Sequence, residues 1–320
     1  MSADAFFRMG STHSICQDYA AAGDWYGQSC AIVSDGCSGA DENGRVPNAA
    51  SGAPWTDWGA RLLVQAARSR IRAICEGHFL AEALIRSVLH RAECLALPRS
   101  ALDATLLVAT VTPAGDVLVH QTGDGVVAWR EVSGAIGYQT VRYALGRPRY
   151  LSYLLDPSAH ERLVAPSGDS DDLLAGSYEV TSNGWQPRQG WGPQLCRTVS
   201  FEASTPYERQ LRFHREMPRD GSLRPAVDVV ALFSDGVESF RDADLNPVPL
   251  ETVLLELLSL KNLHGRFVTR RCGKFLGKLC AEKGWRHADD FSMAAVGFEE
   301  RPGSSEAGKL GSSGSGGERP

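Results

Sequence analysis

The sequence predicts an α+β fold with its sheets and helices stacked in layers, and three observations lead to this class. Apolar runs typical of strands occur in groups, and helices with one apolar face lie between the groups. The strand–helix–strand alternation of a doubly wound parallel sheet is missing, and so are the glycine-rich loops that bind nucleotides. Hydrophobic residues make up 43% and charged residues 22% of the 320 residues, which is the composition of a globular protein.

In the N-terminal half, the first predicted element is a strand over residues 29–35, an apolar run that ends in an Asp-Gly turn. Two amphipathic helices are expected over residues 57–75 and 79–97, because apolar side chains recur there every three or four positions. Two further strands are expected over residues 104–111 and 117–121, where the turn sequence Pro-Ala-Gly separates two apolar runs.

The C-terminal half begins with residues 131–225, which are rich in Gly, Pro, Ser and Arg and contain only scattered strand candidates. A stretch of this length is more often an elaborated functional loop region than a simple linker. A buried strand is then expected over residues 227–233, followed by helices over about 249–260 and 265–283. The last predicted element is a strand over residues 291–298.

We expect one folded domain over residues 1–299 and a disordered tail over residues 300–320. The last 20 residues contain 11 Gly or Ser and almost no apolar side chains. Such a segment buries too little apolar surface to offset the entropy that it would lose on becoming ordered.

The charge and cysteine content exclude several classes of protein. The 33 basic and 38 acidic residues give a formal charge of −5, whereas proteins that bind nucleic acids or anionic membranes usually carry a basic excess. No apolar run approaches the roughly 20 residues of a membrane span, and no basic segment leads into an apolar core at the N-terminus. The eight cysteines include no Cys-x-x-Cys pair, which argues against a disulfide framework or a zinc knuckle. We therefore expect a cytoplasmic protein without nucleic-acid or membrane partners.

Several carboxylates lie at the ends of predicted strands. Asp35 and Asp235 each end an apolar run, whereas Asp289 and Asp290 directly precede one. Rigid strands can bring such groups to one point, as a hard divalent cation requires, and Asp18 is a further candidate. Asp-Gly occurs four times in the chain, however, and a single Asp-Gly after a strand is usually only a turn.

The order of five short motifs is more specific than any one of them. They are Gln17-Asp18, Ser34-Asp35-Gly36, Gly123-Asp124-Gly125, Phe233-Ser234-Asp235-Gly236 and Asp289-Asp290-Phe291-Ser292. In this order they resemble the metal-dependent Ser/Thr protein phosphatases of the protein phosphatase 2C type, and in particular a compact bacterial branch of that family. The resemblance covers roughly residues 8–299 and is weakest across residues 131–225.

The resemblance implies a four-layer α-β-β-α sandwich with two central antiparallel sheets and two Mg²⁺ or Mn²⁺ ions between them. Asp35 matches the carboxylate that bridges both ions, and Asp235 and Asp289 match the other ligands of the first ion. The carbonyl group of Gly36 matches a ligand of the second ion, and Asp18 matches the acidic residue beside the attacking water. Two cations lower the pKa of a water between them and neutralise the phosphoryl oxygens, so attack is in line without a covalent intermediate.

The sequence departs from the family pattern at several positions. His13 stands where the family has an Arg that grips the phosphate, and imidazole lacks the two-pronged donor geometry of guanidinium; the other reading is a surface histidine in a loop. Gln17 stands where a Glu often supports the second ion, and an amide brings no charge. Asp124 matches a residue linked to a third ion, but the usual acidic partner of that site is Ser239 here. Cys37 replaces a proposed general acid of animal members.

The function that the resemblance implies is removal of phosphate from phosphoserine and phosphothreonine in proteins. The implied partners are a phosphorylated protein substrate, and with it a Ser/Thr kinase and its targets. One alternative is a non-catalytic pseudophosphatase that recognises a phosphorylated partner, which the departures keep open. Another is a hydrolase of small phosphoesters, because residues 131–225 would set substrate access and contain no readable code.

Overall fold

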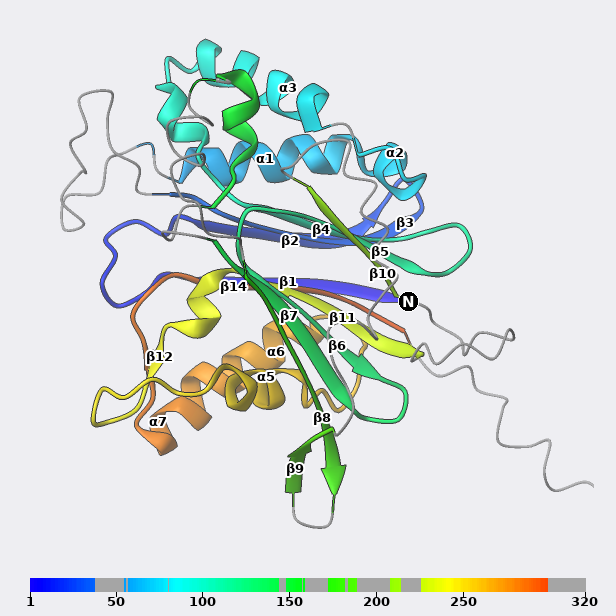
Figure 1. Cartoon of the computed structure of the whole chain (residues 1–320), viewed down its shortest axis with the longest axis vertical. Coiled ribbons are helices and arrows are strands. Elements are labelled where there is room, and N and C mark those ends of the chain that lie inside the picture. Colours follow the sequence, from blue (N-terminus) through cyan, green and yellow to red (C-terminus); the bar gives the residue numbers. More distant parts are fainter. Residues whose placement is uncertain are drawn as a thin grey trace, which may run out of the picture.

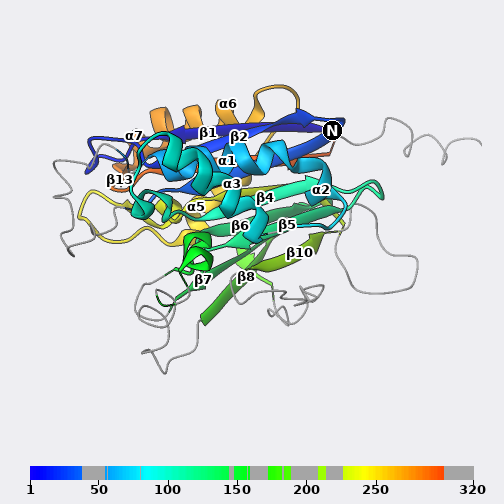
Figure 2. The ribbon, with the colours of Figure 1, turned by 90° about the horizontal axis from the view of Figure 1, so that it is seen from above.

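The strands of the protein form two large antiparallel sheets packed face to face, and helices cover both outer faces (Figures 1 and 2). This computed structural model describes residues 1–37, 55, 57–79, 81–143, 148–156, 158, 172–181, 184–188, 208–213 and 226–298. The arrangement is a four-layer α-β-β-α sandwich with two central antiparallel sheets, so the predicted fold class is confirmed.

One sheet has seven strands in the order β1-β14-β11-β6-β7-β8-β9. They are β1 (Ser2–Arg8), β14 (Phe291–Gly297), β11 (Val227–Phe233), β6 (Val126–Glu131), β7 (Ile136–Arg142), β8 (Asp172–Thr181) and β9 (Gly184–Pro187). The strands β11 and β14 were both predicted from their nearly unbroken apolar runs. Such runs are expected in central strands, which are covered on both faces. The N-terminal strand β1 pairs with β14, with Ser2 opposite Gly297 and Arg8 opposite Phe291.

The other sheet has five strands in the order β10-β5-β4-β3-β2. They are β10 (Arg209–Phe213), β5 (Val117–Thr122), β4 (Leu106–Val111), β3 (Gln28–Asp35) and β2 (Asp18–Trp25). The hairpin of β2 and β3 turns through Tyr26 and Gly27, whose φ values are 55° and 77°. Two such residues are typical of the tight turn whose twist matches a hairpin, and this turn sets the register that places Asp18 opposite Asp35.

Three helices lie on the outer face of the five-stranded sheet (Figure 1). They are α1 (Trp58–Ser69), α2 (Ile71–Cys75) and α3 (Ala81–Cys94). The helix predicted over residues 57–75 is interrupted at Arg70, where φ is −111° and ψ is 9°. The apolar side chains of Leu63 and Ala67 before this break and of Ile71 and Ile74 after it are nevertheless buried, because α2 continues to face the same core as α1.

The outer face of the seven-stranded sheet is covered by the C-terminal helices (Figure 1). They are α5 (Leu250–Leu258), α6 (Phe267–Lys274) and α7 (Cys280–Lys283), and one π-helical turn, Phe275–Leu279, joins α6 to α7. These elements confirm the helices predicted over about 249–260 and 265–283. Among the described residues, no helix is long and apolar enough to cross a membrane.

Residues 131–225 contain strands that the sequence analysis did not identify. The structure describes β7, β8 and β9 here, which extend the seven-stranded sheet, and β10, which forms an edge of the other sheet. The edge strand β10 is preceded by Glu208, whose Oε1 lies 2.6 Å from Nδ1 of the buried His120 on β5. The structure also describes a 3-10 turn here, Leu151–Leu155. Residues 144–147, 157, 159–171, 182–183, 189–207 and 214–225, and the predicted tail over residues 300–320, lie outside the described residues.

Candidate active site

The first two carboxylates of the site face each other across the β2–β3 hairpin. Asp18 begins β2 and lies opposite Asp35, which ends β3. The Oδ2 atom of Asp18 accepts a hydrogen bond of 2.6 Å from the hydroxyl group of Ser234. Its Oδ1 atom is buried and finds no hydrogen-bond partner among the described residues. A buried carboxylate oxygen in this state calls for a proton donor or a cation.

The next two carboxylates come from the seven-stranded sheet. Because β11 and β14 are antiparallel neighbours, the end of β11 and the beginning of β14 lie at the same edge. Asp235 follows β11 in a short 3-10 turn, Asp235–Glu238, and Asp289 lies just before β14. Between them, the hydroxyl group of Ser234 accepts a 3.0 Å hydrogen bond from the backbone N–H of Ser292. Ser234 thus joins the two strands to Asp18 of the opposite sheet.

Asp124 lies in the turn where the chain passes from β5 of one sheet to β6 of the other. Its neighbours Gly123 and Gly125 have φ values of 79° and 116°, a backbone region that favours glycine. A Cβ atom at Gly125 would also lie only 2.7 Å from the carbonyl oxygen of Phe233. This close approach carries Asp124 toward the end of β11 and Asp235.

The electrostatics of the site reflect the burial of several acidic groups together. Burial raises the pKa of Asp18 to about 7 and that of Asp124 to about 7, and the charge of Asp235 adds to both shifts. Burial also raises the pKa of Asp35 well above its usual range, with the charges of Asp18 and Asp235 as further causes. The pKa of Asp289 is raised by burial and then by Asp235. These carboxyl groups would ionise together only if a cation compensated their charge.

The donor chemistry of these residues fits a hard divalent cation, since carboxylate oxygens are the ligands that Mg²⁺ and Mn²⁺ prefer. The unpartnered oxygen of Asp18 supports the same fit. The side chains are not arranged as a finished coordination sphere: within the described ranges, no group of three or more His, Cys, Asp or Glu residues could hold a metal ion as it stands.

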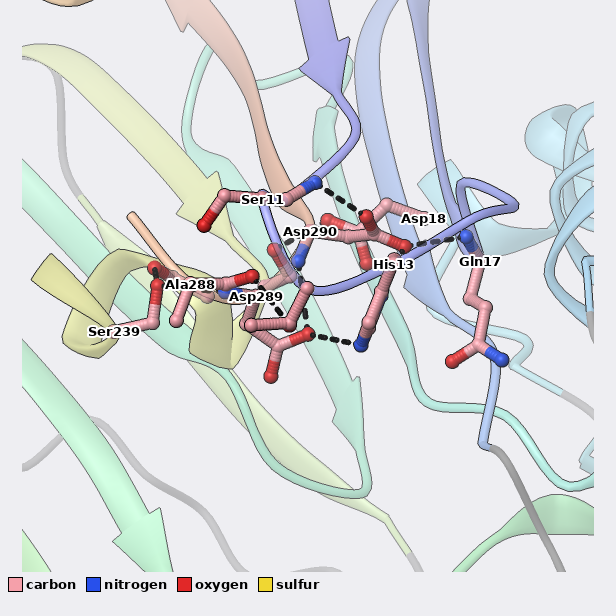
Figure 3. A network of polar contacts seen from close by, with 12 residues as sticks. Ser11, His13, Gln17, Asp18, Ser239, Ala288, Asp289 and Asp290 are labelled. Atoms are coloured by element: carbon pink, nitrogen blue, oxygen red, sulfur yellow. Dashed lines mark hydrogen bonds and ion pairs between the residues drawn. The ribbon is translucent and has the colours of Figure 1, made fainter. Parts of the chain in front are cut away.

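Asp290 is buried and anchors the segment that leads into β2 (Figure 3). Its Oδ1 atom accepts a 2.7 Å hydrogen bond from the backbone N–H of Gly10, and its Oδ2 atom accepts one of 2.5 Å from that of Gln17. The two neighbouring acidic residues therefore differ in environment. The side chain of Asp289 is 45% exposed, whereas that of Asp290 is 1% exposed.

His13 lies between these two carboxylates (Figure 3). Its Nε2 atom is 3.4 Å from Oδ1 of Asp289, and its Nδ1 atom is 3.0 Å from Oδ2 of Asp290. Burial lowers the pKa of His13, but the neighbouring Asp290, followed by Asp289 and Asp18, outweighs burial, so the pKa is raised. The family resemblance implied a position of His13 near the phosphate, but the contacts of His13 with Asp289 and Asp290 were not predicted.

Gln17 and Gly36 are linked through their backbones. The carbonyl group of Gln17 accepts a 3.1 Å hydrogen bond from the N–H of Gly36. The side chain of Gln17 points away from Asp289 and Asp290 in Figure 3, and its role as a ligand stays a prediction. Beyond Gly36, the N–H of Cys37 donates to the carbonyl group of Asp103 over 2.8 Å.

Two glycines allow the segments of the site to pack closely. A Cβ atom at Gly236 would lie 1.6 Å from the carbonyl oxygen of Asp290, and one at Gly10 would lie 2.3 Å from the carbonyl carbon of Asp289. Gly236 belongs to a motif that the sequence analysis singled out, whereas Gly10 and the anchoring role of Asp290 were missed. No local sequence signal reveals such contacts, because the partners are about 50 and 280 positions apart.

We expect Gly236→Ala to destabilise the protein by about 2 kcal/mol, since the added methyl group forces two backbone segments apart. The measurement is the free energy of unfolding in urea. Gly273→Ala is the matched control, because Gly273 lies in α6 with no atom within 4 Å of the added Cβ. This control is expected to be neutral or stabilising, as alanine favours helices over glycine. Equal losses in both variants would contradict the close approach at Gly236.

Comparison with known proteins gives one family and several distant structures. Residues 10–146 match the family described as Protein phosphatase 2C. The S. agalactiae serine/threonine phosphatase is 12% identical, with 93% of this chain and 99% of that chain covered and a TM-score of 0.45. The PP2C phosphatase domain of SpoIIE from Bacillus subtilis is 8% identical, with 93% of this chain and 63% of that chain covered and a TM-score of 0.44. No curated protein sequence matches the chain.

Proposed function

We propose, from the membership of residues 10–146 in the protein phosphatase 2C family, that this phosphatase hydrolyses phosphoserine and phosphothreonine in proteins. The observation that carries the proposal is the meeting of acidic residues from both sheets at one edge of the sandwich. These residues are Asp18, Asp35, Asp124, Asp235 and Asp289. The substrate is then a phosphorylated protein, and a Ser/Thr kinase supplies it, in the cytoplasm.

The proposal includes two Mg²⁺ or Mn²⁺ ions as cofactors. Asp35, Asp235 and Asp289 would hold the first ion, and Asp35 with the carbonyl group of Gly36 would hold the second. Such ions, when bound, acidify a water and neutralise phosphoryl oxygens. Asp124 would hold a third ion less tightly than the other two are held, because Ser239 stands in place of the usual acidic partner.

Asp18 is suited to orient the attacking water and to accept its proton. Its Oδ2 atom is fixed by the hydrogen bond from Ser234, which leaves Oδ1 as the free acceptor. Burial raises the pKa of Asp18, which makes its carboxylate a stronger proton acceptor than that of an exposed aspartate. Ser234 in turn is held by the N–H of Ser292, so Asp18 cannot rotate freely.

His13 is suited to bring positive charge to the phosphoryl group. Its raised pKa favours the imidazolium form, and its contacts with Asp289 and Asp290 fix the ring at the edge of the site. A protonated imidazole attracts a phosphate, although it cannot form the paired hydrogen bonds of an arginine.

The test is phosphate release from a phosphothreonine peptide and from p-nitrophenyl phosphate, with Mn²⁺ or with EDTA. The proposal expects Mn²⁺-dependent release from both compounds and none in EDTA. Release from p-nitrophenyl phosphate alone would favour a hydrolase of small phosphoesters. Binding of the peptide without any release of phosphate would favour the pseudophosphatase. The observation that supports this alternative is Gln17, an uncharged residue where the family often has a Glu that supports the second ion.

A further inference from the structure

A small pocket opens at the outer helical layer, between the end of α5 and the side of α6. Its volume is about 180 Å³, and its lining includes the apolar side chains of Leu260 and Phe267. The charged residues of the lining are all basic. They are Lys261, Arg270, Arg271 and Lys274. In a chain with a net charge of −5, a pocket whose charged lining residues are all cations is a local reversal of charge.

The two arginines are held in place and keep donors to spare. The Nη2 atom of Arg270 donates to Oδ1 of Asn262 over 2.7 Å and to the carbonyl group of His264 over 2.8 Å. Both acceptors are uncharged, so the charge of Arg270 has no carboxylate partner among the described residues. Arg271 pairs with Glu256 through Nη2 at 3.1 Å, but its buried Nε finds no hydrogen-bond acceptor in the described chain.

The two lysines are exposed and form no hydrogen bond or ion pair within the part of the chain that the structure describes. Lys283 and Lys278, which lie farther along the same helical segment, instead pair with Glu256 and Glu282. Lys261 and Lys274 are therefore available to a ligand that brings its own negative charge.

The pocket lies far from the carboxylates of the active site. Leu263, in the loop before α6, packs against Gly297 at the end of β14, whereas Asp290 precedes the beginning of that strand. At roughly 3.3 Å per residue, the seven steps between Asp290 and Gly297 span about 23 Å. Figure 2 shows α6 alongside β1, and Thr269 of α6 donates to Asp4 of that strand. A ligand in the pocket would not touch the reacting phosphate.

We propose that this pocket docks an acidic segment of a protein substrate, in which an apolar side chain is flanked by carboxylates. The apolar side chain would contact Leu260 and Phe267, and the carboxylates would pair with Lys261, Arg270 and Lys274. We choose a peptide as the ligand because the pocket combines an apolar floor with cations at its rim. A free inorganic anion has no apolar group that could pack against this floor. Only the identification of the bound protein as a substrate rests on the proposed function; the binding of an acidic segment does not depend on it.

The direct test is fluorescence anisotropy with a labelled peptide, Glu-Glu-Leu-Phe-Glu-Glu, and the full chain. We expect binding that weakens as salt is added and that is about fivefold weaker in Lys261→Ala/Lys274→Ala, since two exposed charge pairs are lost. Neither lysine side chain forms a hydrogen bond or ion pair with the described residues, so this variant is expected to fold normally. The matched control is Arg72→Ala/Lys278→Ala, which removes two exposed cations outside the pocket, with side chains 81% and 65% exposed.

A second readout separates docking from chemistry. The Lys261→Ala/Lys274→Ala variant should raise KM for a phosphothreonine peptide that carries the acidic segment, while kcat for p-nitrophenyl phosphate stays unchanged. Absence of hydrolysis in the wild type would refute the proposed function but leave the anisotropy result valid. The docking proposal is refuted if the wild type does not bind the labelled peptide, or if the pocket variant and its control bind it equally.

Discussion

Asp35→Asn is expected to remove most phosphatase turnover and, at the same time, to stabilise the metal-free protein. The carboxylate is proposed to serve both ions, so its loss should lower kcat by about 100-fold or more, equivalent to about 2.7 kcal/mol in the barrier. Stability should change in the opposite direction, because Asp35 is partly buried beside the charges of Asp18 and Asp235. A group that serves chemistry at the expense of stability is expected to behave in this way.

The sign of the pH dependence follows from the raised pKa of Asp35. The folded protein keeps this proton at pH values where the unfolded chain, with an aspartate pKa of about 3.9, has lost it. Ionisation therefore opposes folding increasingly as the pH rises above about 4. In EDTA, the Tm of Asp35→Asn minus that of the wild type should be small at pH 5 and larger at pH 8.

The matched control is Asp244→Asn, at an exposed position in the turn after β12 (Phe240–Arg241). It should leave both turnover and the pH dependence of the Tm as in the wild type. If Asp35→Asn retains turnover within threefold of the wild type, Asp35 does not bridge the ions. A Tm difference that shrinks from pH 5 to pH 8 would contradict the position of Asp35 among other acidic groups.

Sequence reasoning missed the edge strands of both large sheets and three inner strands of the seven-stranded sheet. The edge strands β1, β9, β10 and β2 and the inner strands β6, β7 and β8 were unassigned, whereas β3, β4, β5, β11 and β14 were predicted. A central strand is covered on both faces and leaves a continuous apolar run, as in Phe291–Gly297. An edge strand is partly exposed, as in Ser2–Arg8, and its assignment depends on a partner almost 300 residues away.

The candidate site divides in a similar way. Carboxylates such as Asp35 and Asp235 could be found because each directly follows an apolar run. The contacts that position them could not: Ser234 reaches across to Asp18, and Asp290 reaches back to Gly10. Each of these contacts joins residues more than 200 positions apart. The first forms because the two sheets stack, and the second because β1 pairs with β14 in one sheet.

The adjacent acidic residues Asp289 and Asp290 are expected to differ sharply when each is replaced by alanine. Asp290→Ala should lower the free energy of unfolding by about 3 kcal/mol, because the buried N–H groups of Gly10 and Gln17 would lose their acceptor. Asp289→Ala should change it by less than about 1 kcal/mol, since this side chain is 45% exposed. Urea denaturation in EDTA measures both values without any contribution from bound ions.

The two variants should also differ in how their effect on Mn²⁺ binding relates to their effect on stability. Asp289→Ala is expected to weaken Mn²⁺ binding in calorimetric titration with little change in stability. This variant loses a proposed metal ligand but keeps the hydrogen bonds that Asp290 accepts from the backbone. Asp290→Ala acts through the segment that it holds, so its effect on Mn²⁺ should come only with the loss of stability. Asp290→Asn refines the test: its amide can accept one of the two backbone hydrogen bonds, so it should be intermediate in stability. If Asp289→Ala is the more destabilising variant, the anchor is Asp289, and the ligand at this strand must be reassigned to Asp290.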